Sequence, residues 1–260
     1  MKQLLAITGI ALMLASCTHV YYAPNTVNAP LLAEKRETRF NVLLASGGDS
    51  EFTGGELQLA TAVTDNIGIM VNGLAAGEKE DVTHYNINGS TTTREESGKG
   101  SYIEAAGGYF TRFGTGGSWV MEAYVGIGAG TVRNEYGGRN FSKVNSTKLF
   151  LQPSIGYKSK HFEAAIVPRL GHVSWKTKER YISSGGDVTL ETELYDIERN
   201  PSFMVFEPGF VIRAGGPLAK IQVSLSTSTP LGSDRDYTGA LMESANASIG
   251  LSVMFPPKKK

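Results

Sequence analysis

Cysteine is nearly absent from this chain of 260 residues, since Cys17 is the only one. A single cysteine cannot form an intrachain disulfide or a cysteine-rich zinc site, so we expect no disulfide, no metal centre and no bound cofactor. An excess of charge of one sign is absent too, because 25 Lys and Arg residues balance 25 Asp and Glu residues. This balance gives no reason to expect nucleic acid as a partner.

A long hydrophobic run is also missing. The apolar stretch Leu4–Leu14 is too short to span a bilayer. It leads into Leu14-Ala15-Ser16-Cys17, which matches the lipobox at which bacterial lipoproteins are cleaved and acylated. We therefore predict that residues 1–16 are a lipoprotein signal peptide and that Cys17 carries a lipid anchor.

The segment after the anchor lacks a clear period. Residues 17–37 contain Pro24 and Pro30, so we expect an extended, lipidated tether, called the tether below. At the other end of the chain, Pro256 and Pro257 stop the final strand, and residues 256–260 form a basic tail.

Alternation of apolar and polar residues is what the chain has in abundance. Ten alternating segments are joined in turn by five long polar connections and four short turns, and no helix-period pattern of useful length follows the signal. This rhythm predicts an all-β fold over residues 38–255, an antiparallel up-and-down transmembrane β-barrel of ten strands. The expected strands are Thr38–Ala45, Gly55–Val63, Ile67–Ala76, Ser101–Phe113, Ser118–Gly130, Thr147–Tyr157, Phe162–Trp175, Phe203–Ala214, Leu218–Thr229 and Glu243–Phe255.

Each expected strand has one face without ionised groups, which we assign to lipid, and one face that holds the charges. The charged faces contribute a predicted lumen network of Arg39, Glu56, Glu104, Arg112, Glu122, Lys148, Glu163, Arg169, Glu207, Arg213 and Lys220. Charges of balanced sign can pair inside a narrow barrel, so we expect a plugged lumen and no diffusion porin. The alternative is a soluble barrel turned inside out, but its surface would carry unusually few charges.

The tether carries a resemblance to a known group of proteins. It contains Tyr22-Ala23-Pro24-Asn25, Pro30-Leu31-Leu32 and Glu34-Lys35, and the first short turn lies in Ala62-Val63-Thr64-Asp65-Asn66-Ile67-Gly68. These residues resemble the start of lipid-anchored outer-membrane barrels of the Bacteroidota. The resemblance implies a barrel fold and an outer-membrane location, and it supplies no established activity and no catalytic residue.

The expected orientation follows from the connections and from the residues after the anchor. Short turns of such barrels face the periplasm and long connections face outside. Surface-exported lipoproteins of these bacteria have an acidic stretch after the cysteine, whereas Thr18-His19-Val20-Tyr21 follows here. We therefore expect the anchor at Cys17 and both termini on the periplasmic side of the outer membrane.

One pair of residues is a candidate for catalysis. His172 and Ser174 lie at the outer end of the seventh strand, on its lipid face. They resemble the His-x-Ser pair of outer-membrane lipid A deacylases, in which His deprotonates Ser and an acid orients the His. Glu179, Asp187 or Glu191 is placed to supply that acid. The simpler interpretation is that both are ordinary rim residues that hydrogen-bond to headgroups.

These observations favour a non-enzymatic protein, either a structural or accessory subunit of an outer-membrane assembly or a surface-binding scaffold. Its expected partners are outer-membrane lipids, lipopolysaccharide and a larger outer-membrane protein complex. Two alternatives remain: a lipid A ester hydrolase that uses His172, Ser174 and Glu191, and a narrow channel, which requires a wet lumen.

Overall fold

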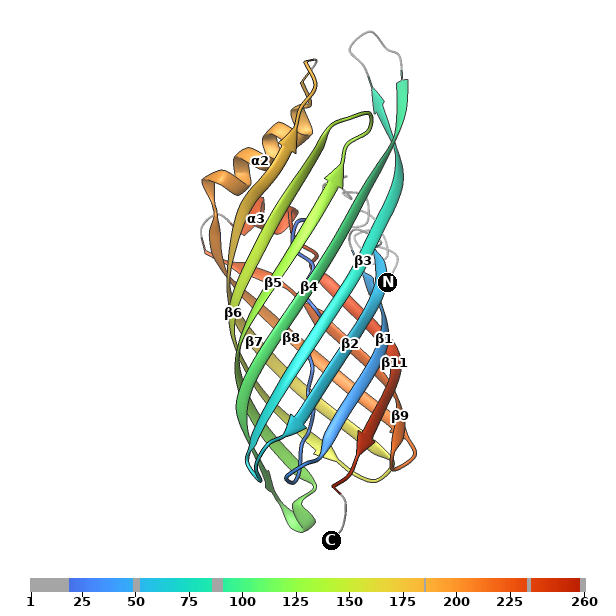
Figure 1. Cartoon of the computed structure of the whole chain (residues 1–260), viewed down its shortest axis with the longest axis vertical. Coiled ribbons are helices and arrows are strands. Elements are labelled where there is room, and N and C mark those ends of the chain that lie inside the picture. Colours follow the sequence, from blue (N-terminus) through green and yellow to red (C-terminus); the bar gives the residue numbers. More distant parts are fainter. Residues whose placement is uncertain (1–18, 49–51, 86–90, 185, 233–234, 258–260) are drawn as a thin grey trace, which may run out of the picture.

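The computed structural model describes residues 19–48, 52–85, 91–184, 186–232 and 235–257, so the predicted signal peptide, Cys17 and the last three lysines lie outside the described residues. Within these ranges, 11 strands form one sheet that closes into a barrel (Figure 1). The strands are β1 Thr38–Gly47, β2 Thr53–Ala62, β3 Ile67–Tyr85, β4 Thr91–Phe113, β5 Trp119–Glu135, β6 Phe141–Lys158, β7 Phe162–Tyr181, β8 Ser202–Gly215, β9 Ala219–Thr227, β10 Thr229–Leu231 and β11 Ala245–Phe255. The helical segments are η1 Thr115–Gly117, α2 Val188–Arg199 and α3 Arg235–Ala240.

The barrel is closed by the pairing of its first and last strands. β1 pairs with β11 in antiparallel register from Thr38 opposite Phe255 to Gly47 opposite Asn246. β9 pairs with both β11 and β8, and the three residues of β10 continue along β8 where β9 ends. The barrel therefore has ten strand positions, and the predicted fold class is confirmed.

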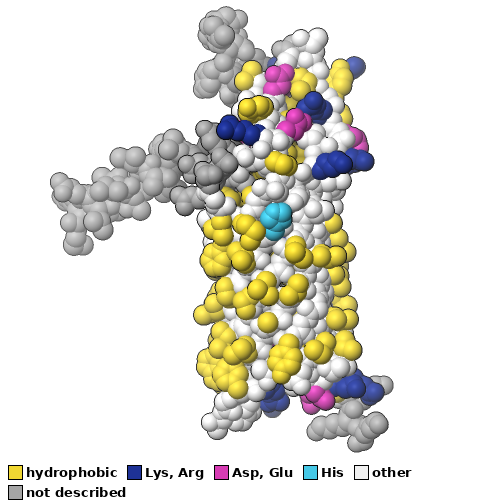
Figure 2. Space-filling view, turned by 90° about the vertical axis from the view of Figure 1, so that its left-hand side faces the viewer, with side chains coloured by type: hydrophobic (Ala, Val, Ile, Leu, Met, Phe, Trp, Pro, Cys, Tyr) yellow, Lys and Arg dark blue, Asp and Glu magenta, His cyan; other side chains and the backbone are white. Residues whose placement is uncertain are grey.

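Burial alternates along the strands as expected for a barrel with an apolar outside. In β5, Trp119, Met121 and Val125 are exposed, whereas Glu122 and Tyr124 are buried. On the face that Figure 2 shows, the result is a broad apolar band over the lower part of the barrel, with charged side chains above and below it. Ionised residues inside and apolar residues outside exclude the inside-out soluble barrel.

The two ends of the barrel differ. All four expected short turns lie at one end, here called the short-turn end, and aromatic rings gather there: Trp119 stacks on Phe113 and meets Tyr157 edge to face. The other end, the long-connection end, extends well beyond the apolar band. β3 and β4 stay paired as far as Tyr85 opposite Thr91.

Several strands therefore extend further at their outer ends than predicted. The segment expected as the long connection 77–100 is mostly strand, stabilised by cross-strand pairs such as Lys79 with Glu95 and Thr83 with Thr93. Beyond the apolar band both faces of the strands are polar, so the alternation disappears while backbone pairing continues.

Helix α2 was not recognised in the sequence, where no helix-period pattern of useful length stands out. The Asp187 carboxylate accepts a hydrogen bond from Leu190 N and begins α2. Leu190, Leu194 and Ile197 share the buried face of this helix. Three apolar residues in a short polar segment are too weak a pattern to stand out in the sequence. No described helix is long and apolar enough to cross a membrane.

A charge introduced into the apolar band tests its contact with lipid. Leu151 lies near the middle of the exposed face of β6 and is 48% exposed. We expect Leu151→Arg to lower the free energy of unfolding in lipid vesicles, measured in urea, by about 2–4 kcal/mol. The control Val188→Arg, at an 81% exposed position of α2, should change it by less than about 0.5 kcal/mol. Equal stability of the two variants would contradict a lipid-facing band.

Candidate functional site

The tether runs through the barrel interior. Figure 1 shows it as the blue chain inside the strands. At the long-connection end, Tyr21 N donates to Leu241 O over 2.9 Å. At the short-turn end, Lys35 N donates to Asp65 Oδ1 over 3.3 Å and Arg36 N donates to Ala62 O over 2.8 Å. The chain therefore crosses the whole lumen before β1 begins.

The described part of the tether begins at the end of the barrel opposite to the one expected for the anchor. We expected the start of the tether at the short-turn end, and His19 lies instead at the long-connection end, against Glu193 of α2. The described C-terminal residues do lie at the short-turn end, next to the start of β1. The physical reason why the tether enters the lumen is its apolar content. Val27, Leu31 and Leu32 are fully buried there, whereas a tether outside the barrel would expose them.

Side chains of the barrel wall bind the backbone of the tether. An extended chain with no strand beside it must find other partners for its buried carbonyl and amide groups. Arg169 Nη2 donates to Asn25 O over 3.0 Å, Gln152 Nε2 to Asn28 O over 2.8 Å, and Arg39 Nε to Pro30 O over 2.7 Å. The wall therefore provides the hydrogen bonds that a neighbouring strand would otherwise provide.

Glycines of the wall make room for the apolar side chains of the tether. A Cβ added to Gly209 would lie 2.2 Å from Val27 Cγ2, and one added to Gly156 would lie 2.6 Å from Leu31 Cδ2. Both are lumen-facing positions where the tether approaches the wall closely. Val27, Ala29 and Leu31 form one buried cluster with Val120, Ala165, Val167 and Val211.

Two ion clusters occupy the lumen around the tether. The upper cluster contains Glu104, Lys148, Arg169 and Glu207, all fully buried as side chains. Arg169 Nε lies 2.7 Å from Glu207 Oε2, and its Nη1 lies 3.3 Å from Glu104 Oε2. The hydroxyl of Tyr22, from the tether, donates to Glu207 over 2.8 Å. The two charge signs balance, and the tether is part of the network.

The lower cluster places three cations around the carboxylate of Glu163. Its oxygens lie 2.8 Å from Arg39 Nη2, 3.2 Å from Arg213 Nη1 and 3.1 Å from Lys220 Nζ. Nearby, Glu122 accepts hydrogen bonds from Leu32 N and Ser154 Oγ. Among the predicted lumen residues, the buried carboxylates of Glu56, Glu104, Glu122, Glu163 and Glu207 match the buried cations in number.

The structure brings all the predicted lumen charges into the interior except Arg112. Arg112 is exposed at the short-turn end, where it donates to Gly116 O and Gly117 O. Neutral lumen residues were missed, among them Gln58, Gln152 and Gln222. They occupy the same alternating positions as the charges, so the alternation of side chains between the two strand faces could alone have identified them.

A smaller cluster, here called the rim cluster, fixes the outer end of the tether and consists of His19, Tyr21, Glu96, Tyr136 and Glu193. His19 Nε2 lies 3.2 Å from Glu96 Oε2, its Nδ1 lies 3.5 Å from Glu193 Oε1, and the hydroxyls of Tyr21 and Tyr136 also contact Glu193. Burial lowers the pKa of His19, but hydrogen bonds and charges of the two carboxylates outweigh it and raise the pKa to about 9. His19 is therefore a cation at neutral pH.

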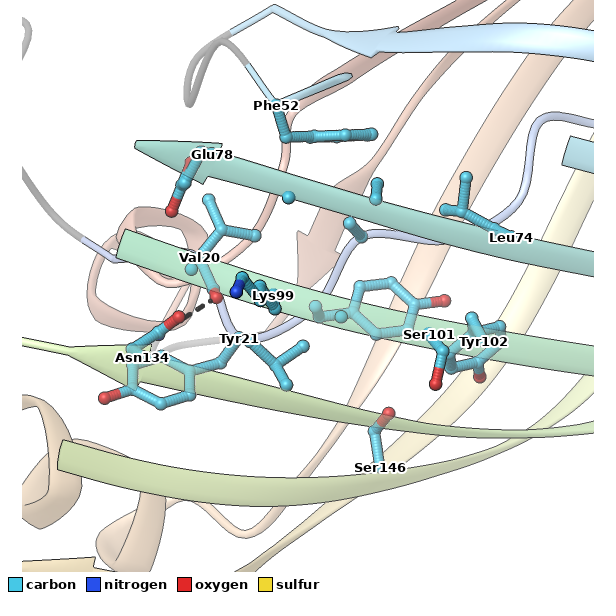
Figure 3. Close-up of a pocket in the computed structure, with 17 residues that line it drawn as sticks. Val20, Tyr21, Phe52, Leu74, Glu78, Lys99, Ser101, Tyr102, Asn134 and Ser146 are labelled. Carbon is cyan, nitrogen blue, oxygen red and sulfur yellow. Dashed lines mark hydrogen bonds between the residues drawn. The ribbon is translucent and has the colours of Figure 1, made fainter. Parts of the chain in front are cut away.

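A small cavity of about 40 Å³ lies beside the outer end of the tether. Figure 3 shows Val20 and Tyr21 of the tether at one end of the cavity lining and Leu74 and Tyr102 of the wall toward the other, with the hydrogen bond from Asn134 Nδ2 to Val20 O. The lining is mostly apolar and aromatic. The volume of the cavity is far below the roughly 300–1,000 Å³ typical of ligand pockets, so the cavity is a packing gap beside the tether.

His172 and Ser174 point outward from β7. His172 lies between Leu149 and Met204 of the neighbouring strands, within the apolar exterior. Among the described hydrogen bonds none joins His172 to Ser174 or either of them to Glu191, which is exposed on α2. A serine hydrolase needs such contacts for proton transfer. The catalytic role of these residues stays a prediction.

The other two candidate acids have partners of their own. Glu179 pairs with Lys143 over 3.3 Å, and Asp187 caps α2 and accepts a hydrogen bond from Asn140. In the described part of the chain, no three His, Cys, Asp or Glu residues come together in a way that could hold a metal ion.

No protein-family model matches the chain, and no curated protein sequence matches it. Among solved structures, the chain is similar to outer-membrane expressed OmpT of Vibrio cholerae, with 13% identity over 79% of this chain and a TM-score of 0.31. The chain spans 57% of that protein's length.

Neutralising the centre of the lower cluster should be costly. Glu163→Gln leaves the cations of Arg39, Arg213 and Lys220 buried without their carboxylate, so we expect a loss of about 3–5 kcal/mol in the free energy of unfolding. The control Glu95→Gln removes an exposed ion pair with Lys79 and should cost less than about 1 kcal/mol. Urea unfolding in vesicles measures both, and similar losses would show that the cluster does not hold the lumen together.

A designed disulfide tests the path of the tether. Val27→Cys together with Gly209→Cys should form a disulfide across the lumen, because the two positions are in direct contact. Val27→Cys with Gly107→Cys is the control, since Gly107 lies on the outer face with no atom near an added Cβ. Mass spectrometry of peptides from unreduced protein detects the bond. A disulfide in the control pair but not in the first would exclude a threaded tether.

Proposed function

We propose that this protein is a lipid-anchored barrel of the outer membrane that acts without enzymatic activity, as an accessory subunit of an outer-membrane assembly or as a surface-binding scaffold. The exposed apolar band supports the membrane location, because a water-soluble protein rarely exposes so much apolar surface. The lipobox Leu14-Ala15-Ser16-Cys17 and the resemblance of the tether to Bacteroidota barrels support the anchor.

The filled lumen is the observation that carries this proposal. A channel needs a continuous wet path, and here the tether occupies the interior with its backbone bound to the wall. Paired ions fill the space around it. This arrangement disfavours the narrow channel and leaves the outer surface as the part through which the protein acts.

The outward face of α2 is the best candidate for contact with a partner. Val188 and Tyr195 lie seven residues apart, which places them on one side of the helix, and they are 81% and 62% exposed. α2 lies at the long-connection end of the barrel (Figure 1), which extends beyond the apolar band of Figure 2, so lipid does not cover these side chains. An apolar, aromatic patch outside the membrane suits a protein of the same assembly better than a headgroup.

The ester hydrolase is the weaker candidate. In its favour, His172 and Ser174 share one exposed face of β7. Against it, the described contacts of these residues do not include the serine–histidine–acid relay that the chemistry needs. We therefore propose a non-enzymatic role.

Affinity purification under mild conditions from native outer membranes, after gentle cross-linking, tests the accessory role. We expect one large outer-membrane protein in stoichiometric amount. Val188→Asp with Tyr195→Asp should reduce its recovery about tenfold or more, because two central contacts are lost. The control Thr189→Asp changes an exposed residue on another side of the same helix and should keep the partner.

The same membranes also test the alternatives. A protein that runs alone in every preparation would contradict the accessory role. A change in lipid A acylation that is lost in Ser174→Ala would move the assignment to the hydrolase. Stepwise conductance in planar bilayers would support the channel.

A further inference from the structure

We propose that the lipid on Cys17 lies in the outer leaflet, so that the protein is fixed to the cell surface by a chain that passes through its own barrel. The inference rests on the proposed function, which supplies an acylated barrel, and on the expected orientation with the short turns in the periplasm. It reverses the orientation that the sequence suggested for the anchor.

The direction of the tether is set by contacts at both ends. At the long-connection end, Tyr22 O accepts a hydrogen bond from Glu243 N over 2.9 Å, and Val20 O accepts one from Asn134. At the short-turn end, the contacts of Lys35 and Arg36 with the turn between β2 and β3 hold the other end. Between them the hydrogen-bonded backbone has no slack to fold back.

Length rules out an anchor in the inner leaflet. The fourteen residue-to-residue steps from Tyr22 to Arg36 span roughly 46 Å if extended, more than the roughly 30 Å of the hydrocarbon core. Cys17 precedes His19 by two residues, so it lies within about 7 Å of His19 along the chain. An anchor so close to the long-connection end cannot reach the opposite side of the bilayer.

The lumen offers no alternative place for the acyl chains. Buried charges and the tether fill it, and alkyl chains placed there would separate ions from their partners. Apolar chains at the long-connection end can enter only the leaflet around that end. The rim cluster keeps them there, because the His19 cation is held between Glu96 and Glu193.

Accessibility of single thiols on living cells tests this proposal. Thr18→Cys reports the side of the anchor, Val188→Cys the long connections, and Thr115→Cys the short turns. Each is treated with a membrane-impermeant maleimide before and after permeabilisation. We expect Thr18→Cys and Val188→Cys to react on intact cells, and Thr115→Cys to react at least tenfold more after permeabilisation. The wild-type protein should stay unlabelled, since acylation consumes its only thiol.

The outcomes separate this inference from the proposed function. Thr18→Cys that reacts only after permeabilisation, while Val188→Cys reacts on intact cells, overturns the inference and leaves the barrel intact. Labelling of the wild-type protein would show that Cys17 keeps a free thiol and would contradict the lipid anchor itself. Surface labelling of Thr115→Cys with protection of Val188→Cys would show that the barrel has the opposite orientation, which overturns both this inference and the proposed function. A second variant with Gly-Ser-Cys-Gly-Ser inserted after Thr18 moves the thiol away from the rim, so local burial cannot hide it.

Discussion

The need to neutralise ionised side chains in a space closed to bulk water governs this structure. Arg39, Arg169 and Arg213 are among the largest fully buried side chains of the protein. Their guanidinium groups are stable inside the barrel only because carboxylates and carbonyl oxygens surround them. Two of those carbonyls, those of Asn25 and Pro30, belong to the tether, so the wall and the tether each complete the hydrogen bonding of the other.

This mutual dependence explains why the interior holds an extended chain and not a second layer of packed helices. An extended chain presents a carbonyl at every residue along the axis, and long Arg, Lys and Gln side chains can reach it from several strands. Small residues are needed where the chain passes closely, as at Gly156 and Gly209. The polar side chains of the wall and the glycine gaps between them therefore have a common cause, which is the extended polypeptide that they surround.

Much of the barrel could be predicted from the sequence, because alternation is a local signal that every strand repeats. The short turns and the lumen-facing positions follow from it directly. The tether could not be placed in this way, since its partners lie on strands far away in the sequence and its own residues have no period. Tyr22, for example, reaches Glu207, 185 residues later. Arg112 was misplaced for a different reason. The alternation along a strand tells which face a residue is on, but not whether that residue lies past the end of the lumen.

The position of the tether directly before β1 also has a topological consequence. β1 closes the ring by pairing with β11, the last strand, so the ring cannot be complete until the whole barrel sequence is available. A lipid at one end of the tether would be too bulky for the filled lumen, and the barrel itself stands at the other end. The tether would then be mechanically trapped inside the closed ring of strands. It must be in place before β1 pairs with β11, and it can be withdrawn only if that pairing opens again.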